Sequence, residues 1–197
     1  MSYSPPKMTA LDRLNSVEHH QKKLRKIHDS NTSKDFVLIS SDGTNRRAHK
    51  TVLDKSSPFF GAGFRAGLNE TELNQYEMPD INTETLDILL RFMYYDCTEG
   101  LKESARTVIV AADKYQMNDL KKSCEDILAA ELSNGTAADL LLLADKVSAF
   151  VLKDAALHHI AVNFKAMEKS AEINKLSDAG NNLTREIFAA VARWGMK

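Results

Sequence analysis

Histidine, cysteine and carboxylate side chains are the first residues to test for chemistry, because metal sites and acid–base pairs are built from them. Four of the six histidines form two adjacent pairs, His19-His20 and His158-His159. Neighbouring side chains on a helix point about 100° apart, and neither pair has the His-Glu-x-x-His spacing of a zinc site. The two cysteines, Cys97 and Cys124, have no metal-binding spacing either. The sequence therefore predicts no metal site.

Nucleophile and phosphate-binding motifs are also missing from the sequence. It contains no Gly-x-Ser-x-Gly elbow and no glycine loop that ends in Lys-Ser or Lys-Thr. Gly61, Gly63 and Gly67 do not have the spacing of a dinucleotide-binding turn. The carboxylate pairs are those that any charge-rich chain contains. We therefore predict that the protein is not an enzyme and uses no cofactor, with an enzymatic activity as the remote alternative.

Length and charge narrow the class of protein further. The chain has 197 residues and a formal net charge of −1 at pH 7, and a neutral chain lacks the basic field that broad nucleic-acid binding needs. No apolar run is long enough to span a bilayer, and the first residues have no secretory signal pattern. Two cysteines without a pairing pattern are typical of a reducing compartment. We expect a cytoplasmic and/or nuclear protein that binds neither membrane nor nucleic acid.

The N-terminal part is expected to hold one helix and one hairpin. Residues 1–10 indicate a disordered start, and apolar residues recur at helical spacing over 11–28. The basic run 22–26 is either a nuclear-import signal or the solvated side of that helix. Residues 35–39 are typical of a buried strand, and Asp42-Gly43 predicts a tight turn into a more polar strand.

The central part predicts a short helix, a sharp stop and a second helix. Ser57-Pro58 makes the stop, because the residue before a proline is pushed out of the α region. Phe59 and Phe60 open the next helix, and an extended segment follows at 76–78. Apolar residues at helical spacing predict further helices at 82–95, 104–115, 118–128, 137–148, 151–164 and 183–194.

Three details of these helices are predicted as well. Asn82 is expected to cap the helix at 82–95. That helix is apolar on two sides, so we expect it to be buried between neighbours. Thr136 with Asp139 indicates a start of the capping-box kind for the helix at 137–148.

The order of short motifs in the centre of the chain resembles a BTB/POZ domain. The motifs are His-Lys-x-x-Leu at 49–53, Ser-x-x-Phe-Phe at 56–60 and Met-Pro-Asp at 78–80, and the resemblance covers residues 35–132. It implies an α+β, mostly helical fold with a small three-stranded sheet flanked by helices. The segment 137–145 resembles the start of the helical BACK region that follows BTB domains in adaptor proteins. The predicted domains are an N-terminal start and amphipathic helix (1–30), a BTB/POZ domain (31–132) and a shortened BACK-like region (133–197).

The resemblance also implies a partner, the N-terminal domain of cullin-3. Cullin-binding relatives carry an apolar residue, any residue and a glutamate at the place of Leu68-Asn69-Glu70, next to Phe64. They use a second patch at the place of Tyr115 and Asn118. The alternatives are that Leu68 folds back onto Phe64 with Glu70 solvated, and that Tyr115 belongs to the core.

A homodimer is the second implication of the resemblance. The amphipathic helix that contains Leu11 and Leu14 is at the place of a dimer-interface helix in the family, and Asp35 and His49 are near the family's dimer region. The alternatives are that the helix covers its own domain and that His49 is simply held at a helix start.

The function we predict is protein–protein assembly. The specific hypothesis is a dimeric adaptor that links an unknown substrate protein to a cullin-3 RING ubiquitin ligase. Such adaptors usually carry a separate substrate-reading module, and the sequence shows none. The alternative is therefore a BTB self-association or transcription-related scaffold protein with no ligase role.

Overall fold

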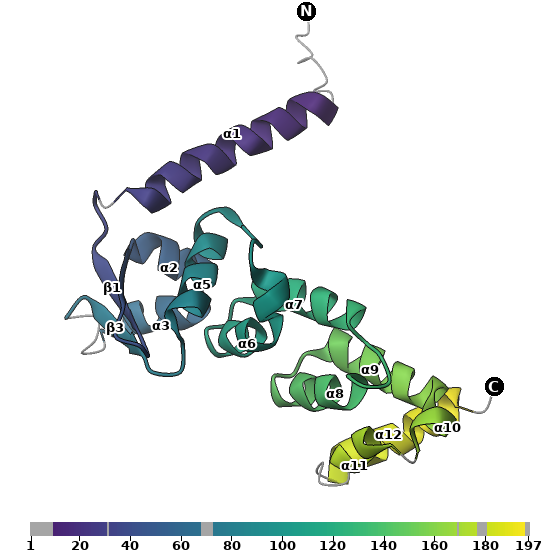
Figure 1. Ribbon diagram of the computed structural model, residues 1–197. Coiled ribbons are helices and arrows are strands. Elements are labelled where there is room, and N and C mark those ends of the chain that lie inside the picture. Colours follow the sequence, from purple (N-terminus) through teal and green to yellow (C-terminus); the bar gives the residue numbers. More distant parts are fainter. Residues whose placement is uncertain (1–9, 31, 68–72, 169, 177–180, 196–197) are drawn as a thin grey trace, which may run out of the picture. The chain divides into compact units, whose positions relative to one another are not determined.

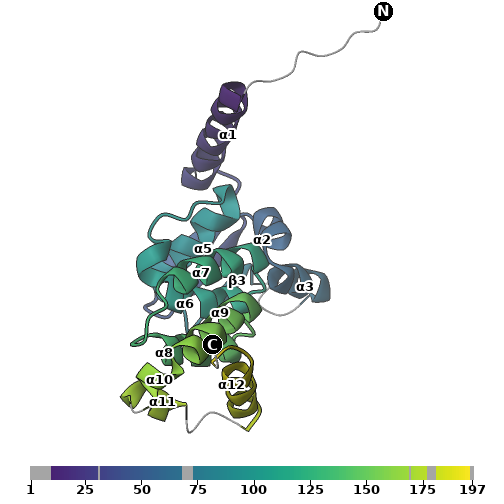
Figure 2. The ribbon, with the colours of Figure 1, turned by 90° about the vertical axis from the view of Figure 1, so that its right-hand side faces the viewer.

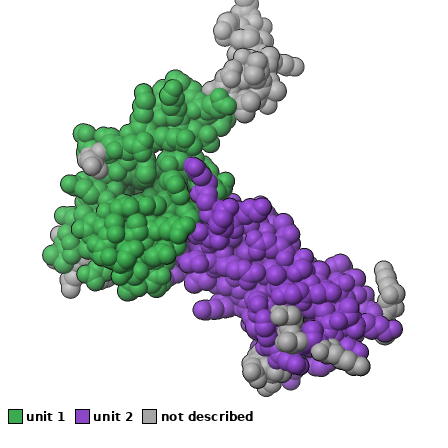
Figure 3. All heavy atoms as spheres, in the orientation of Figure 1, with its two compact units in different colours: residues 1–56, 60–98 green, residues 57–59, 99–197 purple. Residues whose placement is uncertain are grey.

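The computed structural model describes residues 10–30, 32–67, 73–168, 170–176 and 181–195 (Figure 1). The chain divides into two compact units, drawn in green and purple in Figure 3. The first comprises residues 1–56 and 60–98, and the second comprises residues 57–59 and 99–197. The predicted domain limits at 30/31 and 132/133 do not follow this division and stay predictions.

The first unit is built on a three-stranded sheet in the order β2-β1-β3. Strand β1 (Phe36–Ser40) pairs antiparallel with β2 (Asn45–Ala48) and parallel with β3 (Gln75–Met78). Phe36, Leu38 and Ser40 are buried, whereas the residues between them are half-buried, which is the alternation of a strand with one face on a core. The predicted small sheet is confirmed.

Helices accompany this sheet in the first unit. They are α1 (Ala10–Asp29), α2 (Lys50–Ser56), α3 (Pro58–Ala66, whose first two residues belong to the second unit) and α5 (Thr83–Tyr95). The Asn82 side chain accepts a hydrogen bond from the Thr85 N–H at 2.9 Å, so the predicted cap of α5 is confirmed. Leu86, Ile88 and Leu89 are all buried, so α5 is buried on both predicted faces.

The second unit is all helical in its described residues (Figures 1 and 2). Its helices are α6 (Leu101–Lys114), α7 (Asn118–Ala130), α8 (Ala137–Lys146), α9 (Phe150–Val162), α10 (Phe164–Met167), α11 (Ala171–Lys175) and α12 (Asn181–Trp194). Ala138, Leu141, Ile160 and neighbouring buried side chains form the core of its C-terminal part.

Several predicted helix ends are wrong for local reasons. Helix α6 begins at Leu101 and not at Ser104, because Leu101 is fully buried and Gly100 supplies a left-handed turn before it. Helix α8 has Thr136 as its N-cap residue, as predicted, but the predicted capping-box contact is not made. The Thr136 hydroxyl donates to the Glu131 carbonyl at 2.8 Å, and its side chain makes no cap bond to α8.

The helix pairs α6–α7 and α8–α9 are joined by the same turn, which the sequence analysis missed. Gln116 and Ser148 both have left-handed backbones, with φ of 56° and 50°. The next N–H in each turn donates to an alanine carbonyl five residues earlier, Met117 to Ala112 and Ala149 to Ala144, both at 2.8 Å. The signal is an internal repeat: Ala-Asp-Lys at 112–114 and Leu-Lys at 120–121 recur as Ala-Asp-Lys at 144–146 and Leu-Lys at 152–153.

Candidate partner-binding surfaces

Helix α1 carries an apolar stripe that its own unit leaves uncovered. Val17, Leu24 and Ile27 are 53%, 39% and 47% exposed. Leu11 and Leu14, the predicted interface residues, lie on the same helix, but their side chains fall outside the described ones. Exposed apolar side chains along one face of a helix make this face a candidate protein-binding surface.

The C-terminal end of α1 is fixed to α5 by aromatic contacts. The His28 ring lies edge-on to Tyr94 and Tyr95, with centroids 4.9 and 5.7 Å apart. The Arg25 guanidinium lies over Tyr95 at 5.3 Å. Residues 22–26 are exposed on the same helix. The solvated-face interpretation of this basic run therefore fits the structure, and a role in nuclear import stays a prediction.

Asp35 and His49, the other predicted interface residues, both organise the start of α2. The Asp35 carboxylate accepts from the Lys50 N–H at 2.8 Å, as an N-terminal cap does. The His49 N–H donates to the Tyr94 hydroxyl oxygen at 3.0 Å, and the His49 Nδ1 lies 2.7 Å from the same oxygen. Burial raises the pKa of Tyr94. His49 is thus held at a helix start, and a role of either residue in a dimer stays a prediction.

The hydrogen-bond geometry favours one position for the ring proton of His49. Its Nε2 lies 3.3 Å from the Thr32 carbonyl oxygen, which can only accept. A proton on Nε2 would donate to this carbonyl, and Nδ1 would then accept from the Tyr94 hydroxyl.

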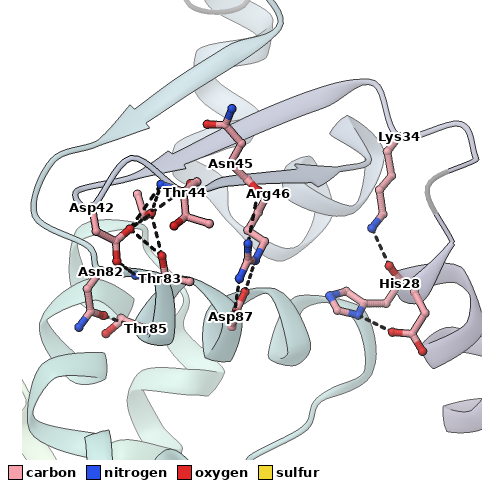
Figure 4. A network of polar contacts seen from close by, with 12 residues as sticks. His28, Lys34, Asp42, Thr44, Asn45, Arg46, Asn82, Thr83, Thr85 and Asp87 are labelled. Carbon is pink, nitrogen blue, oxygen red and sulfur yellow. Dashed lines mark hydrogen bonds and ion pairs between the residues drawn. The ribbon is translucent and has the colours of Figure 1, made fainter.

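A second polar network joins the hairpin to the start of α5 (Figure 4). The Asp42 carboxylate accepts from the Thr83 N–H at 3.1 Å, from the Thr83 hydroxyl at 2.6 Å and from the Ser40 hydroxyl. These donors hold the pKa of Asp42 far below its usual range. Arg46 donates twice to Asp87, at 2.6 and 2.9 Å. Both sets of contacts hold the hairpin on the helix.

The predicted cullin loop is only partly described. Leu68 and Glu70 lie outside the described residues. Phe64, just before them, is half-buried, with its ring 5.1 Å from Phe36 and the Lys50 ammonium 5.9 Å above it. Its ring is thus already packed within its own unit. A contact between Phe64 and cullin stays a prediction.

The second predicted patch is divided between core and surface. Tyr115 is fully buried, with its ring 5.2 Å from that of Phe59, and its carbonyl accepts from the Ser57 hydroxyl at 2.5 Å. Its side chain belongs to the core, which was the alternative, and in this packing it cannot touch a partner. Asn118, the first residue of α7, is exposed and remains available.

An apolar surface at the start of α9 was not predicted from the sequence. Phe150 and Val151 are 75% and 58% exposed, and in the repeat they stand where α7 has Asn118 and Asp119. A shallow groove of about 680 Å³ continues from Val151 along α9, with Asp154 and Ala155 in its lining. The repeat was the sequence signal that would have identified this surface.

Within the part of the chain that the structure describes, no three histidine, cysteine or acidic side chains are placed to hold a metal ion. None of the helices there is both long and apolar enough to cross a bilayer. Cys124 is buried, and burial raises the pKa of its thiol to about 12.

The family of the chain follows from its sequence between residues 24 and 132. The model of the BTB/POZ domain family matches residues 24–132. The match covers more than half of the chain, so the chain belongs to the BTB/POZ domain family. Among solved structures, the BTB domain of zebrafish PATZ1 is similar, with a TM-score of 0.46 and 19% identity over 64% of this chain and 98% of that one.

The family assignment confirms the predicted fold and the coarse function. BTB domains are generally protein–protein interaction modules and not enzymes, and they commonly self-associate as dimers. The three-stranded sheet with its helices is the predicted fold, and the helices after residue 132 are consistent with a BACK-like region.

Proposed function

We propose that this BTB protein is a dimeric adaptor that links a substrate protein to a cullin-3 RING ubiquitin ligase. It acts in the cytoplasm, the nucleus or both, as a binding protein without catalysis, and it contacts neither nucleic acid nor membrane. The observation that carries the dimer is the uncovered stripe of α1. Covering an aliphatic side chain completely contributes about 1.5–3 kcal/mol, so Val17, Leu24 and Ile27, already about half covered, add about 1 kcal/mol each.

The ligase part rests on the sequence of residues 68–70 and on the surface beside α7. In this polar stretch of the sequence Leu68 would be the apolar anchor and Glu70 the charge that steers it, and such a pair suits a central contact with a charged neighbour. Asn118 is exposed and supplies the second patch. Two such surfaces in one dimer would recruit two ligase arms, so that avidity increases substrate capture.

A pull-down with the cullin-3 N-terminal domain tests the ligase part. Wild type should bind, and the double variant Leu68→Glu, Glu70→Lys should not. Leu73→Glu is the matched control, because Leu73 is 69% exposed, is near Glu70 in the sequence and should tolerate the charge. Equal capture of wild type and the double variant would refute the ligase part.

Solution mass tests the dimer independently. Val17→Glu with Leu24→Glu should give monomers, because two charges would have to be buried in the interface. Val162→Glu, which also replaces an exposed valine (56%) but on α9, should leave the mass unchanged. A wild-type monomer at high concentration would remove the dimer from the proposal.

The alternative is a self-associating or transcription-related scaffold without a ligase role. The α1 stripe supports it equally well, because a dimer is common to both functions. A dimer that fails to capture the cullin domain would favour this scaffold.

A further inference from the structure

Two dipeptides in the chain are of the type that can cyclise spontaneously. They are Asp42-Gly43 and Asn134-Gly135, the single Asp-Gly and the single Asn-Gly of the sequence. In such a pair the glycine backbone nitrogen attacks the side-chain carbonyl carbon of the preceding residue and closes a five-membered succinimide ring. Glycine allows the attack because it has no Cβ to obstruct it.

The structure blocks this reaction at Asp42-Gly43. The Asp42 carboxylate is held by hydrogen bonds from Ser40 and Thr83, and its pKa is lowered, so it stays an anion that resists nucleophilic attack. The Gly43 N–H donates to the Ser40 carbonyl at 2.9 Å, so the attacking nitrogen is engaged as well.

The same reaction is left open at Asn134-Gly135. Both residues are exposed, in the turn that the Thr136 N–H closes on the Ser133 carbonyl at 3.1 Å. No heavy atom lies within 4 Å of the position of a Cβ at Gly135. Within the described residues, the Gly135 N–H donates to no acceptor. The nitrogen is therefore accessible to solvent base.

A neighbouring histidine assists the electrophile. His159 Nε2 lies 3.0 Å from Asn134 Oδ1. With the proton on Nε2, His159 donates to the amide oxygen and draws electron density from the amide carbon. The attacked carbon is thus polarised, whereas in Asp42 the negative charge repels the nucleophile.

We propose that Asn134 is a site of spontaneous deamidation in the folded protein. Solvent base removes the proton of the Gly135 nitrogen, which then forms a bond to Asn134 Cγ. The Cγ–Nδ2 bond breaks, and Nδ2 takes a proton and leaves as ammonia. Water then adds to one of the two succinimide carbonyls and leaves either aspartate or isoaspartate at position 134.

The two products act differently on the second unit. Aspartate keeps the backbone of the turn and places a carboxylate beside His159 and before the N-terminus of α8, where negative charge is favourable. Isoaspartate inserts a methylene into the backbone, so the turn closed by Thr136 on Ser133 cannot keep its geometry. The site would therefore alter the connection between α7 and α8 with time.

Tryptic mass spectrometry of the folded full chain tests the proposal. After incubation at mildly alkaline pH, the peptide 123–146 reports on Asn134, its single amide residue, and the peptide 154–165 reports on Asn163 as the internal reference. The expected result is an acid-for-amide mass gain that accumulates in the first peptide and not in the second. Gly135→Ala, which has space for its methyl group and no left-handed φ, should reduce the gain to the level of the reference.

Two results would overturn the proposal. One is equal modification of Asn134 and Asn163 in the folded wild type. The other is modification of a synthetic peptide covering 130–137 while the folded chain stays unmodified, because the fold would then protect the site. Circular dichroism of Gly135→Ala checks that the variant is folded, so a loss of modification reports on the chemistry.

Discussion

Replacing Tyr94 with phenylalanine removes one oxygen atom from the junction of α2 and α5. The Tyr94 ring is 5% exposed, and its hydroxyl group is within hydrogen-bond distance of the His49 N–H (3.0 Å) and of His49 Nδ1 (2.7 Å). The ring that packs against His28 is unchanged by the substitution. The loss is therefore confined to two hydrogen bonds.

The expected effect follows from those two bonds. Each contributes about 0.5–1.5 kcal/mol net, so Tyr94→Phe should lower the free energy of unfolding by about 1–3 kcal/mol. Equilibrium urea denaturation measures this as a lower midpoint with an unchanged slope, because the surface exposed on unfolding stays the same.

Tyr95→Phe is the matched control. Tyr95 lies on the same helix and is buried to a similar degree, at 8% exposed. Within the described residues, its hydroxyl group makes no hydrogen bond to the protein. Its substitution should change the free energy of unfolding by less than about 0.5 kcal/mol. Equal midpoints for the two variants would refute the assignment of Tyr94 as the group that holds His49 at the start of α2.

Three further predictions concern the second unit. Lys121→Met should lower the free energy of unfolding by about 1–3 kcal/mol, because the Lys121 ammonium group donates to Asp113 and to the carbonyls of Val147 and Ser148. Lys122 is exposed, so Lys122→Met should leave the stability unchanged, and thermal denaturation compares the two variants. Gly195→Ala should lower the free energy of unfolding by about 1–3 kcal/mol, because the added Cβ would lie 2.9 Å from the Ala161 carbonyl oxygen. Faster hydrogen exchange of the α12 amides would report this destabilisation. Between pH 9 and about 12 the unfolded chain releases the Cys124 proton that the folded chain keeps, so the free energy of unfolding should fall as the pH rises through this range. Cys124→Ala should make this fall with pH smaller, as measured by urea denaturation at several pH values.

The sheet and the long helices could be predicted because their signals are local. Phe36, Leu38 and Ser40 are buried in alternation along one strand, and Asn82 caps a helix whose apolar residues recur at helical spacing. Such patterns need no knowledge of distant residues. The ordered motifs of the family supplied the arrangement of these elements.

The candidate site was harder to predict because burial depends on distant parts of the chain. Tyr115 has the same aromatic signal whether it faces a partner or the core, and Ser57 and Phe59, far away in sequence, place it in the core. Phe150 is the opposite case. Its helix is apolar along its length, so periodicity alone does not reveal that this phenylalanine is exposed.

The internal repeat explains why the family boundary at residue 132 is not a boundary in packing. The Glu125 carboxylate on α7 is buried and accepts from the Leu152 N–H of α9 at 3.0 Å, and Lys121 donates to the Ser148 carbonyl at 3.2 Å. A chain cut after Leu132 would keep both charged side chains and lose both of these partners. Because a hydrogen bond to a charged group contributes about 1.5–3 kcal/mol, the BTB domain of this protein should be less stable alone than with its helical tail. The compact unit of residues 57–59 and 99–197 accordingly includes both the last helices of the BTB domain and the helical tail.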